Sequence, residues 1–379
     1  MRLKDSIKEY AYSQGFDLVG FTTIKPLLET RRILKQRLEE GYVFPFEMDN
    51  VERITDPRSL LPGARSVIAL GMSYSVSENF IPPKPEGKLL GLISRYAWGL
   101  DYHRVFIQKM KRLGDYINSI KKANYRVFVD TGSIIDRAVA YRAGLGWISK
   151  NTCLANPRYG TWVFLGEIIL DIELEPDTPL QNRCGKCERC LNVCPTGALF
   201  EPYKINPMKC LSYLTQKRGW IPWEYRSKFG NRLYGCDTCQ ERCSINSTAV
   251  SGNHKEFMPV VLKPYMELTS LFSITNAEFK KTFGRSAAGW VGKSTILRNA
   301  LIVLGNFRDE GAEPILLKAL KHPSPVIRGH AAWAIARCLG KSKGLICLEK
   351  ALAIENNDEV KHEIIQSIKM IQGERKQDD

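Results

Sequence analysis

Residues 182–199 carry the sequence NRCGKCERCLNVCPTGAL, and the rest of the chain is organised around them. Their four cysteines, Cys184, Cys187, Cys190 and Cys194, follow the spacing C-x2-C-x2-C-x3-C, with a proline after the last. Eight of the eleven cysteines in the chain lie between Cys184 and Cys243. Cysteines gathered in this way, in a chain whose N-terminus has no secretion signal, indicate metal binding rather than disulfides.

The first four cysteines match the bacterial ferredoxin run, in which the fourth cysteine ligates the other of two clusters. A second group, GCDTCQERC at residues 235–243, lacks one cysteine, and Cys210 can supply it. Exchanging the fourth ligands then uses all eight thiolates and predicts two 4Fe-4S clusters. The first would be held by Cys184, Cys187, Cys190 and Cys243, and the second by Cys194, Cys210, Cys236 and Cys239. Zinc also uses C-x2-C pairs, but it does not require such a run ending in Cys-Pro.

The remaining cysteines, the composition and the charge narrow the class of protein. We expect Cys153, Cys338 and Cys347 to be buried packing residues. The 379 residues suit two or three domains, and the 44% hydrophobic fraction is that of a folded protein. No apolar run has the length of a membrane span, so we expect a cytoplasmic protein with no membrane partner. The net charge of +15 favours a polyanionic partner, although a merely basic surface would also explain it.

Hydrophobic patterns divide the chain into four predicted parts. Residues 1–175 alternate strand-like and helix-like segments, which predicts an α/β domain. Within it, residues 101–123 predict a helix whose buried face carries Val105, Met110, Leu113, Ile117 and Ile120. Residues 176–250 predict a ferredoxin-like domain with two clusters, and residues 251–290 a connecting segment. Residues 291–379 are helical throughout, and the similar contexts of Arg298 and Arg328 favour HEAT-like repeats over an ordinary bundle.

Two short motifs in the first part carry possible chemistry. In FVDTGSIIDRA a strand ends at Asp130 before a loop and a helix, which is a common position for a catalytic carboxylate. The alternative is that Asp130 or Ser133 caps the following helix. DYHRVF at residues 101–106 begins like the D-x-H-x-x-G motif of proteins that ligate cobalamin through histidine, but Phe106 replaces the glycine. We therefore expect His103 to be an ordinary helix-face residue. Neither a G-x-G-x-x-G motif nor a P-loop is present.

One long stretch completes a set of motifs that resembles a known family. YRAGLGWISKNTCLANPRYGTWVFLGEI occupies residues 141–168 and accompanies RYAWGLDYHR, VDTGS and the two cysteine runs. Together they resemble the epoxyqueuosine reductase family over essentially the whole chain, including the helical tail. The resemblance implies a cobalamin-dependent iron–sulfur reductase that removes the epoxide oxygen of epoxyqueuosine at the wobble position of tRNA. It also implies cobalamin bound base-off, with electrons reaching it one at a time from the clusters and, ultimately, from an external one-electron reductant.

The resemblance suggests residues for each role. Asp130 matches the aspartate that donates a proton to the departing oxygen, which requires a carboxyl protonated near neutral pH. The candidates for cobalamin binding, which would otherwise make ordinary loop hydrogen bonds, are Arg58, Tyr96, Ala97, Asp130, Ser133, Ile134, Asn151, Thr152, Arg158, Ser212 and Asp237.

The RNA face is expected where basic and aromatic residues alternate, at LTQKRGWIPWEYRSKFGNR and on the helical tail. The candidates are Lys217, Arg218, Trp220, Arg298 and Arg328. The alternative for the first three is a packed aromatic insertion with a solvated charged face.

Two other functions are consistent with the same motifs. A reductive dehalogenase-like enzyme would use the same cofactors on a small halogenated substrate, but such a substrate needs neither the basic charge nor the helical tail. A cluster-bearing module that binds tRNA or transfers electrons would need no chemistry of its own. Bound corrin separates this module from the two enzymes, and turnover of epoxyqueuosine in tRNA separates the enzymes from each other.

Overall fold

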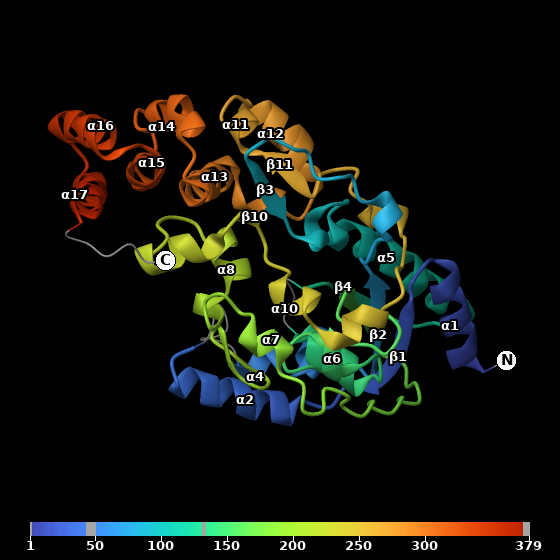
Figure 1. Ribbon diagram of the computed structural model, residues 1–379. Helices are drawn as coiled ribbons and strands as arrows, with labels where there is room; N and C mark the ends of the chain where they lie inside the picture. The colour runs from blue at the N-terminus through green and yellow to red at the C-terminus, as the bar shows by residue number, and fades with distance from the viewer. Residues whose placement is uncertain (1, 43–50, 131–133, 374–379) are drawn as a thin grey trace. The chain divides into compact units, whose positions relative to one another are not determined.

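The structure, a computed structural model, describes residues 2–42, 51–130 and 134–373 (Figure 1). It divides into two compact units, each assembled from segments far apart in sequence. Unit 1 comprises Met1–Ile81, Gly99–Cys210 and Thr238–Met258, and unit 2 comprises Pro82–Trp98, Leu211–Asp237 and Pro259–Asp379. No helix among the described residues is both long enough and apolar enough to cross a membrane.

A four-stranded sheet forms the centre of unit 1. Its strands, in spatial order, are β1 (Leu18–Thr23), β2 (Ser66–Ser73), β7 (Val163–Leu170) and β4 (Tyr125–Phe128). Every neighbouring pair is antiparallel. The alternation of helices and strands expected for an α/β domain is therefore present, but without a parallel sheet. All of β2 is buried, which agrees with its run of apolar residues.

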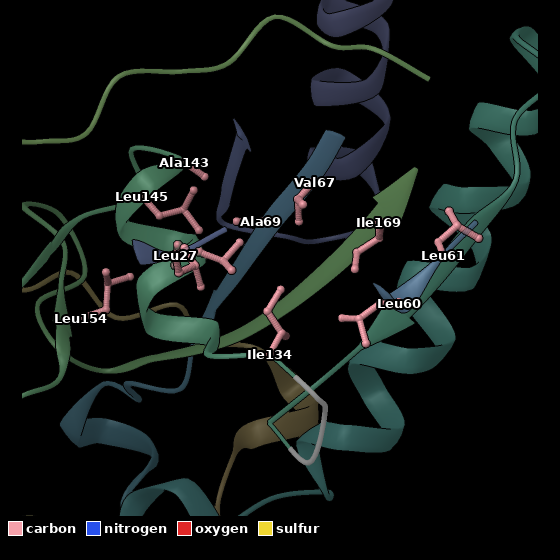
Figure 2. Close-up of a cluster of buried hydrophobic side chains, with 12 residues drawn as sticks. Leu27, Leu60, Leu61, Val67, Ala69, Ile134, Ala143, Leu145, Leu154 and Ile169 are labelled. Atoms are coloured by element: carbon pink, nitrogen blue, oxygen red, sulfur yellow. The ribbon is translucent and has the colours of Figure 1, made fainter. Parts of the chain in front are cut away.

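Helices cover both faces of this sheet. On one face lies α5 (Tyr102–Ile120), because Gly166 of β7 faces Phe106 and a side chain there would meet its ring at 2.7 Å. The other face carries α6 (Asp136–Arg142), and Figure 2 shows Val67, Ala69 and Ile169 of the strands in the cluster beneath it. Since side chains alternate along a strand, Glu167 lies on the same face as Ile169 and faces α6.

The other helices of unit 1 are short, apart from α1 and α2. They are α1 (Leu3–Ser13), α2 (Leu28–Glu39), α4 (Val51–Ile54), η1 (Pro57–Leu60) and η2 (Glu78–Phe80). The expected helix at residues 101–123 is confirmed, and its buried face includes Met110 and Ile117, but Ile120 is 45% exposed. The prediction of burial is wrong for Ile120, which is the last residue of the helix.

The cysteine-rich part of unit 1 has little regular structure, as expected for a segment that folds around clusters. Its elements are α7 (Arg189–Asn192), β8 (Leu199–Glu201), β9 (Lys204–Ile205), η4 (Pro207–Lys209), α10 (Thr238–Glu241), η6 (Ser244–Thr248) and η7 (Lys255–Phe257). A small hairpin of β5 (Trp147–Ile148) and β6 (Leu154–Ala155) lies earlier in the chain.

Unit 2 combines a three-stranded mixed sheet with a run of helices. β3 (Leu90–Ile93) pairs in parallel with β10 (Arg232–Tyr234) and antiparallel with β11 (Tyr265–Glu267). The shorter helices are η3 (Arg95–Ala97), α8 (Leu211–Gln216), α9 (Trp223–Arg226), η5 (Ser227–Phe229), α11 (Leu268–Leu271), α12 (Asn276–Thr282), η8 (Phe283–Arg285), η9 (Gly289–Val291) and η10 (Glu310–Ala312). The helical tail consists of α13 (Lys293–Phe307), α14 (Glu313–Ala319), α15 (Pro325–Cys338), α16 (Lys341–Ile354) and α17 (Asp358–Gln372).

Candidate functional site

The first predicted set of cluster ligands lies together in unit 1. The Ser244 hydroxyl, next to Cys243, donates to Cys187 Sγ at 3.6 Å. Burial raises the pKa of the Cys243 thiol, and the nearby thiols of Cys184 and Cys187 raise it further. Burial, followed by the charge of Cys243, raises the pKa of Cys190 to about 11. Residues 184–190 and Cys243 thus come together across more than fifty positions of sequence, as the exchanged ligand sets require.

The second set divides at the boundary between the units. Cys194, Cys210 and Cys239 belong to unit 1, and Cys236 is the next-to-last residue of a segment of unit 2. Asn151 Nδ2 donates to the backbone oxygen of Cys239 at 3.5 Å, which connects this set to the loop after β5. The grouping of these four cysteines stays a prediction.

The arrangement of the thiols bears on the choice between zinc and clusters. Among the described residues, no group of three or more Cys, His, Asp or Glu side chains converges on a point that one metal ion would occupy. Tetrahedral zinc requires such convergence, because its Zn–S bonds are only about 2.3 Å long. A four-iron cluster is larger and gives each thiolate an iron of its own. The ferredoxin-like spacing of the cysteines, ending in Cys-Pro, is what favours clusters over zinc.

Of the three other cysteines, Cys338 is buried as expected, whereas Cys153 and Cys347 are partly exposed, so the expectation of burial is wrong for these two. Cys338 is buried and donates to the Leu304 carbonyl at 3.3 Å, and burial raises its pKa to about 11. Burial also raises the pKa of Cys153 to about 11, so this thiol is a poor source of thiolate at neutral pH. Cys347 is partly exposed on α16.

Asp130 lies just beyond β4 in an unusual backbone conformation. Its φ of 50° is in the left-handed region, which a residue with a side chain rarely adopts. Its side chain is 64% exposed, and its backbone N–H donates to Asp136 Oδ1 at 3.0 Å. The N-cap of α6 is Ile135, so the alternative that Asp130 caps this helix is wrong. Ser133, the other proposed cap and a cobalamin candidate, lies outside the described residues.

Two side chains at the start of α5 lie close to the carboxylate of Asp130. The Tyr102 hydroxyl donates to Asp130 Oδ2, and the Tyr102 ring stacks on Phe164 at 4.2 Å between centroids. His103 Nε2 lies 3.8 Å from the same oxygen, and His103 Nδ1 is 2.7 Å from Asp101 Oδ1. Burial opposes protonation of His103, but the hydrogen bond and charge of Asp101, with the charge of Asp130, raise its pKa. His103 lies on the first turn of α5, as expected, and in addition contacts Asp101 and approaches Asp130.

A second carboxyl group lies beneath Asp130 in the core. Glu167 has no exposed surface, and its carboxyl group shares a hydrogen bond with the carboxyl group of Asp136. Burial raises the pKa of Glu167 well above its usual range, and the charges of Asp136 and Asp130 add to this effect. Burial also raises the pKa of Asp136. In the sequence, the acidic side chain within the apolar run VFLGEIIL is the signal that could have predicted this buried carboxyl group.

A cavity of about 680 Å³ opens in unit 1 beside α2 and α6. Leu28, Ile33, Tyr141 and Tyr203 line it, and these apolar side chains are 40–66% exposed (Tyr141 the least, Leu28 the most). Polar groups of Arg137, Thr152 and Asn182 also face it. An exposed apolar lining with a few polar groups is typical of a site for a large organic ligand.

The cobalamin candidates of unit 1 differ in how exposed they are. Thr152 lines the cavity and has a φ of 67°, and its carbonyl accepts from Arg137 at 2.7 Å. Asn151 and Ile134 are almost completely buried. Arg58 is exposed and paired with Asp56 at 2.6 Å, and Arg158 is exposed beside the ring of Tyr159.

Four further cobalamin candidates lie in unit 2. The Asp237 carboxylate accepts from the Ser94 hydroxyl and from the backbone N–H of Arg95. The Tyr96 and Tyr234 rings are 5.7 Å apart, and burial raises the pKa of Tyr96 well above its usual value. Ser212 and Asp237 are near enough to Tyr96 to influence that pKa. Ala97 is fully buried, and its carbonyl accepts from the Ser286 hydroxyl at 2.5 Å.

Comparison with known proteins identifies the family. The model described as epoxyqueuosine reductase QueG, DUF1730, matches residues 55–131, a 4Fe-4S double cluster binding domain matches residues 183–246, and HEAT repeats match residues 294–369. The chain is 42% identical to the epoxyqueuosine reductase of Bacillus subtilis strain 168, over 98% of this chain and 97% of that protein. The chain belongs to the epoxyqueuosine reductase family. The resemblance found in the sequence and the expectation of HEAT repeats are confirmed.

Solved structures of epoxyqueuosine reductases share the whole fold. A crystal structure of one with an epoxyqueuosine-modified tRNA-Tyr stem loop has a TM-score of 0.94 and 41% identity, covering 98% of this chain and 99% of that one. The Bacillus subtilis enzyme with its catalytic aspartate loop swung out of the active site has a TM-score of 0.92 and 40% identity, covering 97% and 98%. The present chain is thus an oxidoreductase, and the hypothesis of a module without chemistry is wrong.

For this member of the epoxyqueuosine reductase family, the structure contradicts one of the five expected RNA contacts. Arg298 is fully buried and donates to the carbonyls of Lys217, Gly219 and Leu214, at 2.5 to 3.2 Å. It has no surface to offer a phosphate, so the prediction is wrong for Arg298. Its guanidinium instead fixes the end of α8 to α13.

The other four RNA candidates stay predictions, with different degrees of exposure. Trp220 packs on Gly329, where a Cβ would come within 2.4 Å of the ring, and its Nε1 donates to Glu359. Arg328 is paired with Glu355 at 2.6 Å, and its side chain is 17% exposed. The Lys217 amine donates to the Trp220 carbonyl at 3.3 Å, whereas Arg218 is exposed.

Proposed function

We propose that this enzyme reduces epoxyqueuosine to queuosine at the wobble position of tRNA, with Asp130 as the proton donor. The relatives bear the name of this activity, and one solved relative contains an epoxyqueuosine-modified stem loop. The net charge of +15 suits a nucleic acid partner. The observation that carries the proposal is the placement of Asp130: exposed, in a left-handed conformation, and held by Tyr102.

The residues present fit the groups that this reaction needs. The eight cysteines would hold two 4Fe-4S clusters, in the two sets named above, and an external one-electron reductant would supply them. The exposed apolar cavity beside α6, with Thr152 and Arg137 at its edge, would hold part of a base-off cobalamin. When bound, cobalamin supplies a low-potential cobalt centre for reducing the carbon–oxygen bond. The remaining cobalamin candidates of unit 1 would contact its periphery, and those of unit 2 rest on the family resemblance alone.

The protein's own part in the chemistry is a proton transfer. Tyr102 donates to Asp130 Oδ2, and His103 approaches the same oxygen, so Oδ1 is the oxygen that we assign to the substrate side. The Asp130 carboxyl group gives its proton to the epoxide oxygen as the first carbon–oxygen bond breaks, which leaves a hydroxyl group on the neighbouring carbon. That hydroxyl group takes a second proton, from solvent, and leaves as water, while the two electrons that the new carbon–carbon double bond requires come from the external reductant through the clusters. The exposed position of Asp130 allows a nucleotide of a large RNA to reach it. In the proposed domain organisation, residues 1–175 carry out this chemistry and residues 176–250 hold the clusters. Residues 251–290 connect these parts to the HEAT-like residues 291–379, which would bind tRNA.

Replacing the proton donor tests the proposal. Asp130→Asn should lower turnover of epoxyqueuosine-containing tRNA by about 10²–10⁴-fold, because an amide cannot act as the acid. The visible spectrum of the anaerobically purified holoenzyme should still show clusters and corrin in normal amounts. Asp115→Asn is the matched control, since Asp115 lies on α5 beside Tyr125 and away from the site. Near-normal turnover by Asp130→Asn would refute the role of Asp130, and turnover of a halocarbon with inert tRNA would refute the substrate.

A further inference from the structure

Trp290 on η9 is the most exposed aromatic side chain among the described residues, at 61%. Its backbone is nevertheless fixed, because the neighbouring residues Ala288 and Val291 are buried. Gly289 packs so closely on the turn before it that a Cβ there would come within 2.5 Å of the Phe283 carbonyl oxygen. Unit 2 therefore holds a large apolar ring in solvent on a rigid base.

Hydrogen bonds also fix the orientation of this ring. Trp290 Nε1 donates to Gln216 Oε1, at the end of α8, at 3.3 Å. The same oxygen accepts from the Tyr234 hydroxyl at 3.1 Å, and Gln216 Nε2 donates to the Ser212 carbonyl at 2.9 Å. Single exposed apolar side chains are common on protein surfaces and need no explanation. An indole anchored at its polar edge is different, because its ring is already ordered for a partner that contacts its face.

Exposed cations come from the segment that precedes this tryptophan. Arg285 lies on η8, the turn on which Gly289 packs, and it is exposed. Lys280 and Lys281 at the end of α12 are exposed as well. Within the part of the chain that the structure describes, none of these three cations forms an ion pair with a carboxylate. Their charges are therefore available to an anionic partner.

Another exposed cation comes from the segment that anchors the indole. Arg218 follows Gln216 by two residues and is exposed. The carbonyls on both sides of it, those of Lys217 and Gly219, accept from the buried guanidinium of Arg298 at 2.5 and 2.8 Å. Arg298 has no surface for RNA, but it holds the backbone that presents Arg218.

An ordered aromatic face among cations suits an unpaired nucleotide. A base stacks on such a ring through its own face, while lysine and arginine bind the phosphates. Bases inside a stem are already stacked on one another, so in a stem loop it is the loop that offers a free face. We propose that Trp290 is the stacking platform for an unpaired base of the tRNA loop, with Arg218 and Arg285 binding phosphates near that base. This inference rests on the proposed function, because it requires tRNA as the substrate.

Binding of an epoxyqueuosine-containing stem loop to the holoenzyme, measured without reductant so that no turnover occurs, tests the platform. Trp290→Ala should raise the Kd about tenfold, which is within the usual range for the loss of one stacked base. Trp290→Phe keeps an aromatic face and should stay within about threefold of the wild type. Phe307→Ala is the matched control, since Phe307 is a 39% exposed aromatic residue at the other end of α13, about 22 Å along the helix. Its Kd should not change. An unchanged Kd in Trp290→Ala would overturn the proposal.

The salt dependence of binding separates stacking from charge. Arg285→Ala should lower the slope of log Kd against log salt concentration by about 0.7, because one phosphate contact with a single strand is lost. Trp290→Ala should leave this slope unchanged, since stacking releases no counterions. An equal change of slope in Trp290→Ala would show that the variant disturbs the basic surface as a whole and would overturn the role of the ring.

A double-mutant cycle with abasic stem loops separates stacking from a structural role. Each loop nucleotide in turn is replaced by an abasic one. At one position the replacement should weaken binding to the wild type about tenfold and have little effect on binding to Trp290→Ala. If every abasic position weakens binding to both proteins equally, Trp290 stacks on no base and the proposal is wrong. If the wild-type holoenzyme does not bind the intact stem loop, the proposed function itself fails, whatever Trp290 contributes.

Discussion

The carboxyl groups near Asp130 differ sharply in their surroundings. Asp130 is exposed and Asp136 is partly exposed, whereas Glu167 is completely buried on the α6 face of the sheet. A buried carboxyl group is more stable when protonated, because the core cannot solvate the charge. Burial therefore favours the protonated, uncharged form of Glu167.

The pH dependence of stability should reveal this buried acid. The folded-state pKa of Glu167 is raised, so its contribution to stability is present below the unfolded value of about 4.3 and is lost as pH rises toward the folded value. Glu167→Gln replaces the titrating carboxyl group with an amide, so the variant does not lose stability in this way as the pH rises. We expect the variant to be more stable than the wild type by about 1–3 kcal/mol at pH 8 and to have the same stability near pH 4. Urea unfolding at several pH values measures the difference, and a pH-independent difference would contradict it.

At the scale of elements, the exchanged cluster ligands have a direct consequence. Cys243 lies between α10 and η6 and joins the run of residues 184–190, which lies about fifty positions earlier. In the proposed grouping, each cluster ties together two distant segments of chain. Because metal binding supplies folding energy in such small segments, removal of the iron should loosen the cysteine-rich part of unit 1.

Replacing a single cysteine ligand should remove one predicted cluster and leave the other in place. Cys243→Ala and Cys210→Ala should each lower the iron content by about four atoms per chain, but they should leave different clusters intact, distinguishable by electron paramagnetic resonance. Cys153→Ala is the control, since Cys153 is partly buried near the ligands but belongs to neither set, and its iron content should equal that of the wild type. Identical residual spectra for the two ligand variants would show that the grouping is wrong.

At the scale of a whole unit, two buried arginines hold together parts of unit 2 that are distant in sequence. Arg226 on α9 forms a two-pronged ion pair with Glu363 on α17, at 2.7 and 2.8 Å, and its side chain is 1% exposed. Arg298 on α13 binds the carbonyls at the end of α8. Both residues connect the helical repeats to the insertion between Cys210 and Cys236.

Breaking the buried pair should destabilise unit 2. Glu363→Ala leaves the Arg226 guanidinium without its counter-charge in the core, and we expect a loss of about 3–5 kcal/mol in the free energy of unfolding. The control is Glu313→Ala, which removes the partner of Lys343, a residue with a 53% exposed side chain, and should cost at most about 1 kcal/mol. Chemical denaturation of the two variants measures both values, and equal effects would show that burial of the pair contributes nothing.

The sequence by itself determined the family, the number of clusters, and the helical tail. These features rest on spacings between near neighbours, such as C-x2-C and the period of an α-helix, which survive without knowledge of the fold. The antiparallel sheet, the contact of His103 with Asp130, and the burial of Glu167 and Arg298 were decided only by the tertiary structure. Asp130 and His103 are 27 positions apart, and Arg298 is 81 positions from the carbonyl of Lys217. Charge and exposure at such positions depend on which distant segments pack together, and no local pattern carries that information.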